Sequence, residues 1–244
     1  MLASVLYHFA NCSHGYVSAG GGTAVIDGSA SSYNQAIGSC RRIFSFVAKR
    51  RLGSIRGEGI LLYVKPDFYR LEVWDDMGNL IFHYVENNEE FEIMSLDDYE
   101  DVFSMIDPDE EDNQGTGFTL EEIKSIGLCL FEVEGGAEYI QDDGIMVTTL
   151  LPLDRDTTIE RRFTFEKSSG MPSRFLVVKN GKKLREAVFE NVEKSSGISR
   201  PHKVKIIDHV LSTTVTLSVV QESINTAIPV ELFSINGNTW SNGE

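Results

Sequence analysis

The sequence is poor in positive charge and in long apolar runs. Its 244 residues include 22 Lys and Arg against 37 Asp and Glu, which gives a formal net charge of −15 at pH 7. Nucleic-acid binding relies on Lys and Arg side chains that release counterions from the phosphates, so this balance argues against a nucleic-acid partner. No stretch approaches the roughly 20 apolar residues of a membrane-spanning helix. The folded part of the chain is therefore not expected to cross a bilayer as a helix.

Cysteine and histidine are also scarce. The three cysteines, Cys12, Cys40 and Cys129, match no C-x-x-C or zinc spacing, and the five histidines are scattered. We therefore expect no metal site. Cys40 and Cys129 could form a disulfide in an oxidising compartment, or both could be small buried apolar residues, and the sequence leaves the two alternatives open.

The patterns of nucleophilic catalysis and phosphate binding are missing as well. No serine lies in a Gly-x-Ser-x-Gly turn, and no cysteine has a neighbouring histidine that would activate it. The glycine-rich stretches at 20–22 and 57–59 lack the lysine and the strand-to-helix context of a phosphate loop. We predict no catalytic residues, no cofactor and no enzyme activity.

The N-terminal 32 residues differ in composition from the rest. An apolar start with signal-peptide character precedes Cys12, which is a candidate for lipidation because a lipoprotein signal ends at the cysteine that receives the lipid. A stretch rich in Gly, Ser and Ala follows and is typical of a flexible tether. We expect a signal remnant or tether over residues 1–32, one domain over 33–236 and a tail over 237–244.

The domain itself reads as mainly β. Period-2 runs rich in β-branched and aromatic residues, separated by turn residues such as Asn180-Gly181, predict about eleven strands joined as hairpins. Thr119 and Glu122 form a capping box before an apolar repeat at helical spacing, which predicts one helix over residues 119–131. We predict a single, strongly curved antiparallel sheet, an unclosed β-barrel, whose concave face is covered by this helix.

Alternating apolar residues of the strands point to one face of this sheet. A filled core and a ligand cavity give the same pattern, so the sequence leaves both open. The candidates for the lining are Leu62, Val64, Leu71, Val73, Phe82, Tyr84, Phe91, Ile93, Phe163, Phe165, Leu176 and Val178.

Two charged segments allow alternatives. The acidic residues between 97 and 112 lack the spacing of an EF-hand, so that a solvated loop is the simpler interpretation and a cation site the other. A basic island in this acidic chain is either a docking patch for an acidic partner or lipid head groups, or a set of solvent-facing positions on a strand pair. Its members are Arg41, Arg42, Lys49, Arg50, Arg51 and Arg56.

The order of several short motifs resembles LolA/LolB-like proteins. The front half is carried by GEGILLYVKPDFYRLEVW at 57–74, GNL at 78–80 and NNEEFEI at 87–93. The back half is carried by TIERRFTF at 158–165, GMPSR at 170–174 and IPVELFSI at 228–235. The resemblance covers roughly residues 33–236.

The resemblance implies an unclosed β-barrel with a helical lid over an apolar cavity that receives acyl chains. It makes the helix at 119–131 the lid, with Leu120, Ile123, Ile126 and Leu130 on its apolar face. Lys65 matches the basic residue that precedes the proline of a turn in the family and helps to hold the lid. The protruding apolar loop of LolB-type members is not evident, because the turn at 75–78 offers only Met77.

The expected function is therefore non-enzymatic binding or carrying of lipoprotein acyl chains or other lipids in the bacterial cell envelope. We expect a monomer in the periplasm, peripheral to the outer membrane or anchored to it by lipid, that exchanges cargo with envelope transport proteins. One alternative is a sensor or scaffold domain of the same fold that binds a protein partner. Another is an enzyme on this fold that shapes a hydrophobic substrate.

Overall fold

The computed structural model describes most of the expected domain. The described residues are 36–51, 53–88, 90–96, 99, 102, 106, 117–131, 137–140, 144–152, 158–166 and 168–235. The expected tether, Cys12 with it, and the expected tail lie outside these residues.

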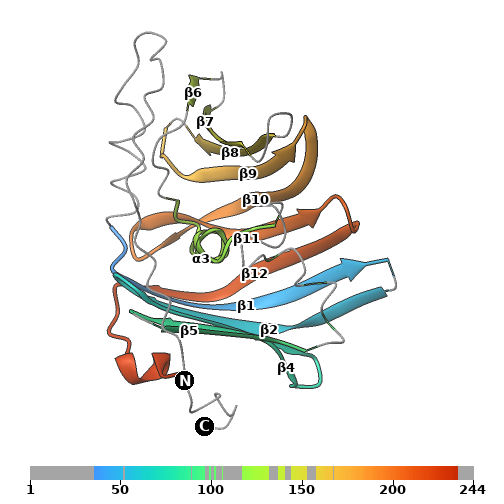
Figure 1. Cartoon of the computed structure of the whole chain (residues 1–244). Helices are drawn as coiled ribbons and strands as arrows, with labels where there is room; N and C mark the ends of the chain where they lie inside the picture. The colour runs from blue at the N-terminus through green and yellow to red at the C-terminus, as the bar shows by residue number, and fades with distance from the viewer. Residues whose placement is uncertain are drawn as a thin grey trace, which may run out of the picture.

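The strands in the described part of the chain form one antiparallel sheet of 12 strands with the order β5-β4-β3-β2-β1-β12-β11-β10-β9-β8-β7-β6. The strands are β1 (Ser39–Arg50), β2 (Gly53–Val64), β3 (Phe68–Asp75), β4 (Leu80–Asn87), β5 (Glu90–Ser95), β6 (Ala137–Ile140), β7 (Gly144–Pro152), β8 (Thr158–Glu166), β9 (Pro172–Lys179), β10 (Lys182–Ser195), β11 (Ile198–Asp208) and β12 (Thr213–Ile224). Figure 1 shows the sheet curving around the helix α3 (Leu120–Leu128). The strands β5 and β6 are its two edges, so the prediction of a curved, unclosed sheet is confirmed.

The connections follow the sequence closely, because most neighbouring strands in the sheet are also neighbours in the chain. The β9–β10 hairpin turns through Asn180 and Gly181, both with positive φ, of 49° and 77°. Asparagine and glycine tolerate this conformation, which gives a two-residue turn the twist of the flanking strands. The hairpin predicted at Asn180-Gly181 is therefore present.

The main hydrophobic core fills the concave face. In β1 the buried side chains of Phe44, Phe46 and Ala48 alternate with half-buried ones, as expected for a strand with one face on a core. Phe163 and Phe175 stack in parallel from β8 and β9, with ring centroids 4.4 Å apart. Gly59 makes room for Phe44, because a Cβ at position 59 would lie 2.2 Å from the aromatic ring.

A second, smaller cluster lies away from the main core and holds the C-terminal segment. Ile60, Leu62 and Val85 are buried with Phe233, which belongs to the 3-10 helix η2 (Val230–Phe233). The Arg70 side chain donates a hydrogen bond of 2.6 Å to the backbone carbonyl of Leu232. This part of the sheet therefore buries apolar residues on both of its faces.

The helix has the boundaries that its capping signals suggest. The Thr119 hydroxyl accepts a hydrogen bond from the Glu122 amide at 3.1 Å, and the Glu122 carboxylate accepts one from the Thr119 amide at 3.0 Å. The helix ends before Cys129, which adopts the left-handed conformation with φ of 53°. The observed helix is thus the N-terminal two thirds of the predicted range 119–131.

The aromatic stack predicts a large loss of stability for Phe175→Ala. Phe175 is fully buried and contacts Phe118, Phe131 and Phe163. We expect the free energy of unfolding to fall by about 3–5 kcal/mol, because the truncation removes buried area and leaves a cavity. Urea denaturation followed by circular dichroism measures the change. Val220→Ala, at a site that is 72% exposed, is the control and should shift the free energy by less than about 0.5 kcal/mol.

Candidate functional site

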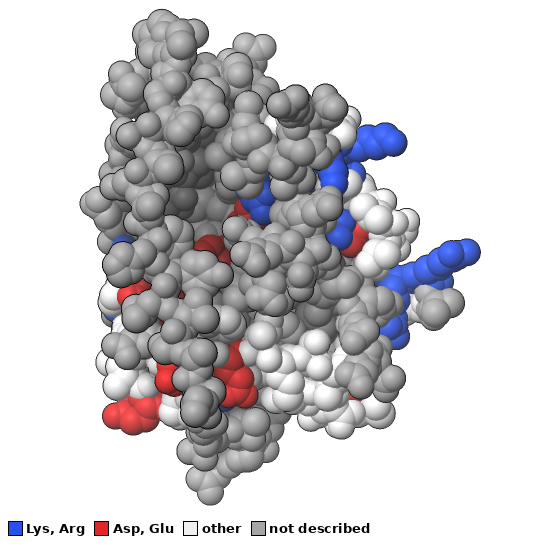
Figure 2. Space-filling model, viewed as in Figure 1, with Lys and Arg blue, Asp and Glu red and all other residues white. Residues whose placement is uncertain are grey.

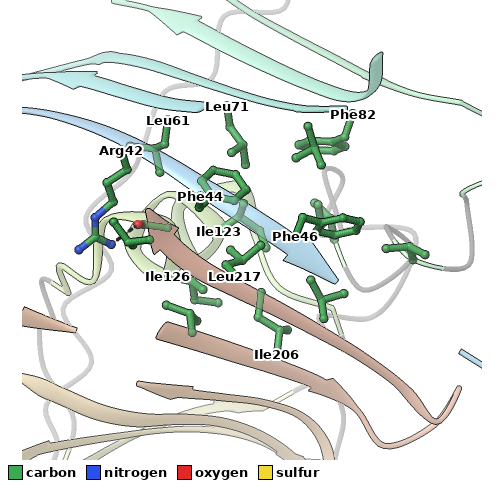
Figure 3. A pocket seen from close by; sticks show the side chains of 17 residues that line it. Arg42, Phe44, Phe46, Leu61, Leu71, Phe82, Ile123, Ile126, Ile206 and Leu217 are labelled. Atoms are coloured by element: carbon green, nitrogen blue, oxygen red, sulfur yellow. Dashed lines mark hydrogen bonds between the residues drawn. The ribbon is translucent and has the colours of Figure 1, made fainter. Parts of the chain in front are cut away.

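An apolar pocket lies between the helix α3 and the concave face of the sheet. Side chains of β1, β12 and α3 converge on it, and Arg42 lies at one end (Figure 3). Apart from Arg42 and Gly127, every residue of the lining is aliphatic or aromatic. The lining is formed by Arg42, Phe44, Phe46, Leu61, Leu71, Val73, Phe82, Val102, Ile106, Ile123, Ile126, Gly127, Val204, Ile206, Val215, Leu217 and Val219.

The pocket is narrow with α3 in this position. Its cavity volume is about 70 Å³, and the empty space reaches about 740 Å³ only when the part open to solvent is included. Pockets that bury a drug-sized ligand measure roughly 300–1,000 Å³. The enclosed part therefore has room for a few atoms of a ligand, and a longer apolar ligand needs α3 to move outwards.

A buried arginine contacts the C-terminal end of α3. Arg42, on β1, is 2% exposed, and its Nη1 donates hydrogen bonds to the carbonyl of Gly127 at 2.8 Å and to Sγ of Cys129 at 3.2 Å. Its Nη2 donates to the carbonyl of Pro201 on β11 at 3.1 Å. Because the last carbonyls of a helix lack partners within it, this contact satisfies a group that would otherwise be buried without one.

A second buried arginine completes the same cluster. Arg200, on β11, is fully buried, donates to the carbonyl of Leu128 and contacts Sγ of Cys40 at 3.2 Å. Glu222 lies between the two guanidinium groups, with Oε1 at 2.5 Å from Nε of Arg42 and at 3.0 Å from Nη1 of Arg200. We call Arg42, Arg200 and Glu222 the arginine cluster. It places two positive charges at the negative end of the helix dipole and balances one of them with a carboxylate.

The carboxyl group of Glu222 is tuned by this environment. Burial disfavours its charged form, but the positive charges of Arg42 and Arg200 outweigh burial, so the pKa of Glu222 lies below its ordinary value. Oε2 of Glu222 also faces Nε2 of His202 at 3.5 Å. The carboxylate therefore stays charged at neutral pH and holds the two arginines together.

The thiols of Cys40 and Cys129 are part of this environment. Both cysteines are buried and free. Burial is the largest influence on the Cys40 thiol and raises its pKa, so the thiol stays neutral at physiological pH. Of the two alternatives that the sequence left open, the structure has the small buried residues and not the disulfide.

The rest of the helix is attached to the sheet by further charged groups. At its N-terminal end, Nε of Arg161 on β8 lies 2.5 Å from Oε1 of Glu122, the residue that closes the capping box. Halfway along it, the Lys124 ammonium lies 2.8 Å from a carboxylate oxygen of Glu86 on β4. Together with the arginine cluster, these contacts tie α3 to the strands at its two ends and in the middle.

The helix packs closely on the sheet at Gly127. A Cβ there would lie 2.7 Å from Cδ1 of Leu61 and 3.0 Å from the hydroxyl of Tyr69. The missing side chain lets the last turn of α3 pack directly on β2 and β3. A larger residue at position 127 would therefore hold the helix away from the pocket.

The structure brings together only part of the residues that the sequence singled out. Those on the lining are Leu71, Val73, Phe82, Ile123 and Ile126. Others belong to the same core or pack against it without lining the pocket, namely Tyr84, Ile93, Leu120, Leu130, Phe163 and Phe165.

The remaining candidates lie elsewhere. Leu62 and Val64 belong to the second cluster, around Phe233. Leu176 and Val178 are buried but lie outside the main core, which takes the alternate residues Phe175 and Val177 of the same strand. Phe91 is 58% exposed on the edge strand β5. Much of the lining comes instead from residues of β1, β11 and β12, strands on which the sequence had indicated no candidate for the lining.

The C-terminal end of α3 is contacted by Arg42 and Arg200, neither of which was connected with the helix from the sequence. Lys65, expected to hold the lid, is exposed in the turn between β2 and β3, where its backbone amide donates to the carbonyl of Gly38 at 2.9 Å. Arg42 was grouped with a basic surface island, and Arg200 was not singled out. The signal for Arg42 was its place in the alternating series Cys40, Arg42, Phe44, Phe46, which puts its side chain on the apolar face.

The described residues contain neither a group of side chains that could hold a metal ion nor a helix that could span a membrane. Within them, no three His, Cys, Asp or Glu side chains are arranged so that they could hold a metal ion. Most of the acidic segment at 97–112 lies outside the described residues. No helix in the described part of the chain has the length and apolar character to cross a membrane.

Comparisons with known proteins identify the fold. No protein-family model and no curated protein matches the sequence. A LolA superfamily protein from Nitrosomonas europaea has a similar structure, with a TM-score of 0.55 and 12% sequence identity, over 88% of this chain and 99% of that one. A domain described as an outer membrane lipoprotein-sorting protein, from Vibrio parahaemolyticus, gives a TM-score of 0.53 and 13% identity over 85% and 94% of the two chains. The chain has the fold of LolA superfamily proteins.

The arginine cluster predicts a specific dependence of stability on pH. Because the pKa of Glu222 is lowered in the folded protein, its contribution is present above the unfolded value of about 4.3 and is lost as the pH falls through the folded value. Glu222→Gln should cost about 3–5 kcal/mol at pH 7, since it leaves two buried arginines without their counter-charge. Denaturant unfolding at pH 7 and at successively lower pH tests both statements. The gap between variant and wild type should narrow below about pH 4, and a gap independent of pH would contradict the assignment.

Proposed function

We propose that this protein binds the acyl chains of lipoproteins or of other lipids in the bacterial cell envelope, without catalysis. The observation that carries the proposal is the pocket itself, an almost wholly apolar space beneath a short helix that polar contacts attach to the sheet. Apolar linings of this kind suit a ligand that has no polar groups to satisfy. The fold shared with LolA superfamily structures supports the same assignment.

The driving force for binding is the burial of the acyl chain. Each methylene group removed from water contributes about 0.8 kcal/mol, so that about ten groups contribute about 8 kcal/mol before the costs of binding are subtracted. The pocket offers no carboxylate or hydroxyl that would select one lipid head group. We therefore propose that the protein recognises the chains of its cargo and leaves the head group at the mouth of the pocket.

Loading requires the helix α3 to act as a lid. Ile123 and Ile126 line the pocket from the side of α3, and the enclosed volume of about 70 Å³ is too small for a whole chain. The contacts at the two ends of α3 are polar and can exchange for water when the helix moves, whereas its apolar face gains contacts with the cargo. In a carrier, the closed and open positions of the helix must be close in free energy. A ligand shifts their populations only by the difference between its affinities for the two positions.

The location follows from the same proposal. Cargo of this kind is met in the periplasm, and the candidate lipidation of Cys12 would hold the protein at the outer membrane through the N-terminal tether. In that arrangement the folded domain exchanges lipids with envelope transport proteins as a monomer.

A second candidate function is a sensor or scaffold that binds a protein partner. It is favoured by the edge strand β5, where Phe91 is 58% and Met94 is 38% exposed. An edge strand with exposed apolar side chains can pair with an extended segment of another chain. Co-purification of a stoichiometric protein in the absence of lipid would favour this function over the carrier.

Lipid binding is tested by extracting the purified protein with organic solvent and identifying the lipid by mass spectrometry. We expect the wild type to carry acyl lipid and Phe82→Asp to carry none, because the charge would lie in the apolar pocket. Val215→Phe fills the same space with apolar atoms and should abolish cargo at a cost of about 1–3 kcal/mol in stability.

Val220→Asp, on the exposed side of β12, is the matched control and should retain lipid. A wild type that yields no lipid, and that also takes up no fluorescent fatty acid in solution, would refute the carrier function. Normal lipid content in a folded Val215→Phe variant would place the cargo elsewhere.

A further inference from the structure

The basic island of the sequence divides into two parts in the structure. Arg42 is buried in the arginine cluster, whereas Lys49, Arg51 and Arg56 are exposed at the end of the β1–β2 hairpin. This hairpin end lies at one rim of the curved sheet, the rim to which β1, β3, β9 and β11 run. The net charge of the chain is −15, so this group of exposed cations has a charge opposite in sign to that of the chain as a whole.

The β11–β12 turn is next to this hairpin and exposes two aliphatic side chains. Val210 is 60% and Leu211 is 44% exposed. The pairing of Lys49 with Thr214 and of Asp208 with Thr213 sets the turn at 209–212 directly beside the end of β1. Exposing aliphatic side chains to water is unfavourable. The protein either bears this free-energy cost, or a binding partner covers the two side chains.

A buried carboxylate gives this turn a defined shape. Oδ1 of Asp208 accepts hydrogen bonds from the backbone amides of Val210 at 2.7 Å and of Leu211 at 2.8 Å, and it contacts Nη1 of Arg185 at 3.1 Å. Asp208 is itself fully buried. The two aliphatic side chains are therefore presented by a preorganised turn, which lowers the entropic cost of binding through them.

A second group of cations lies on the other side of the turn. The pairing of Arg185 with Asp208 places the β9–β10 hairpin, with the exposed Lys182 and Lys183, beside the β11–β12 turn. The acidic Glu186 of β10 is buried, and its carboxylate contacts Arg174, His209 and, at 3.7 Å, Nζ of Lys183, whose side chain is 47% exposed. Figure 2 shows Lys and Arg projecting from the right-hand side of the molecule at two heights, with uncharged surface between them.

We propose that this rim docks on the surface of a membrane that contains anionic phospholipids. Val210 and Leu211 enter the head-group layer, and the cations of the two flanking hairpins contact lipid phosphates. Exposed aliphatic residues between basic groups fit such a surface, because the apolar area and the cation–phosphate attraction add up. The acidic remainder of the protein is repelled by the same surface, which fixes the orientation of the docked molecule.

The lining of the pocket extends from Arg42 towards the same rim, where it includes Ile206 and Val215. The arginine cluster is at the opposite end of the strands, since β1 passes Arg42, Phe44 and Phe46 on its way to Lys49. Ile206 and Val215, which line the pocket, lie close to the β11–β12 turn in sequence. Docking goes beyond the proposed lipid binding and does not depend on it.

Sedimentation with lipid vesicles tests the docking surface on the full chain. Vesicles of phosphatidylcholine alone are compared with vesicles that also contain phosphatidylglycerol. We expect binding to the anionic vesicles only, and weaker binding when the ionic strength rises from about 0.01 M to 0.15 M, because the Debye length falls from about 30 Å to about 8 Å. Lys182→Gln with Lys183→Gln should lower the partition coefficient about 25-fold, at about five-fold for each cation lost.

Val210→Asp with Leu211→Asp should lower the partition coefficient at least about ten-fold. The matched controls are Val220→Asp and Lys194→Gln, which should bind as the wild type does. Val220 is 72% exposed on the same strand as the turn, and Lys194 is exposed near the far end of β10. Lys194 lies about 40 Å along the strand from Lys182, well beyond a Debye length.

Three outcomes would overturn the proposal. They are a wild type that does not bind anionic vesicles, control variants that lose binding as much as the rim variants do, and equal binding to neutral vesicles without dependence on salt. Uptake of a fluorescent fatty acid, measured without vesicles, separates docking from cargo binding. Vesicle binding without uptake would refute the proposed function and support the docking surface. Uptake without vesicle binding would support the proposed function and refute the docking surface.

Discussion

The arrangement of this protein depends on how the C-terminal end of one short helix is satisfied inside an apolar core. The carbonyls of Gly127 and Leu128 are among the last of the helix, where partners within the helix are lacking, and the hydrogen bond to Leu128 is buried. Arg42 and Arg200 supply the donors, and Glu222 balances one of their two charges. Because these three residues come from β1, β11 and β12, the strands at the centre of the sheet must be paired in this register before the helix can dock.

Such a cluster specifies a position more than it adds stability. Buried ion pairs recover little beyond the cost of their desolvation, but a misplaced helix would leave the carbonyls of Gly127 and Leu128, and the guanidinium groups that donate to them, without these hydrogen bonds. The apolar contacts of Ile123 and Ile126 tolerate sliding, whereas hydrogen bonds to guanidinium groups do not. The helix thus has one well-defined closed position, from which departure replaces specific polar contacts by water.

The fold could be predicted from the sequence largely because its signals are local. Asn180-Gly181 marks a hairpin by its own backbone preferences, and Thr119 with Glu122 marks the start of the helix. The face of a strand was harder to assign. β2 carries Ile60, Leu61 and Leu62 in succession, and period 2 has no polar position there to fix which residue points inwards.

The assignment of Leu62 to the cavity face failed for this reason, since the segment around Phe233 buries the other face of β2. The same holds for Leu176 and Val178 in a strand whose neighbours Phe175 and Val177 take the core. The partners of Arg42 could not be read from the sequence at all, because Gly127, Pro201 and Glu222 are brought to it by long-range strand pairing. Lys65 was placed in a turn by a motif match, and it lies in the turn between β2 and β3.

The open edges of the sheet give the molecule a mechanical property that a closed barrel lacks. In a closed barrel, the circumference is fixed by the number of strands and their stagger, and a wider interior would require broken hydrogen bonds between strands. Here β5 and β6 end the sheet without meeting, so that its curvature can change while every strand keeps its neighbours. An open sheet can therefore bend, which changes the width of its concave side. The size of what the concave side encloses is then not fixed by the number and stagger of the strands.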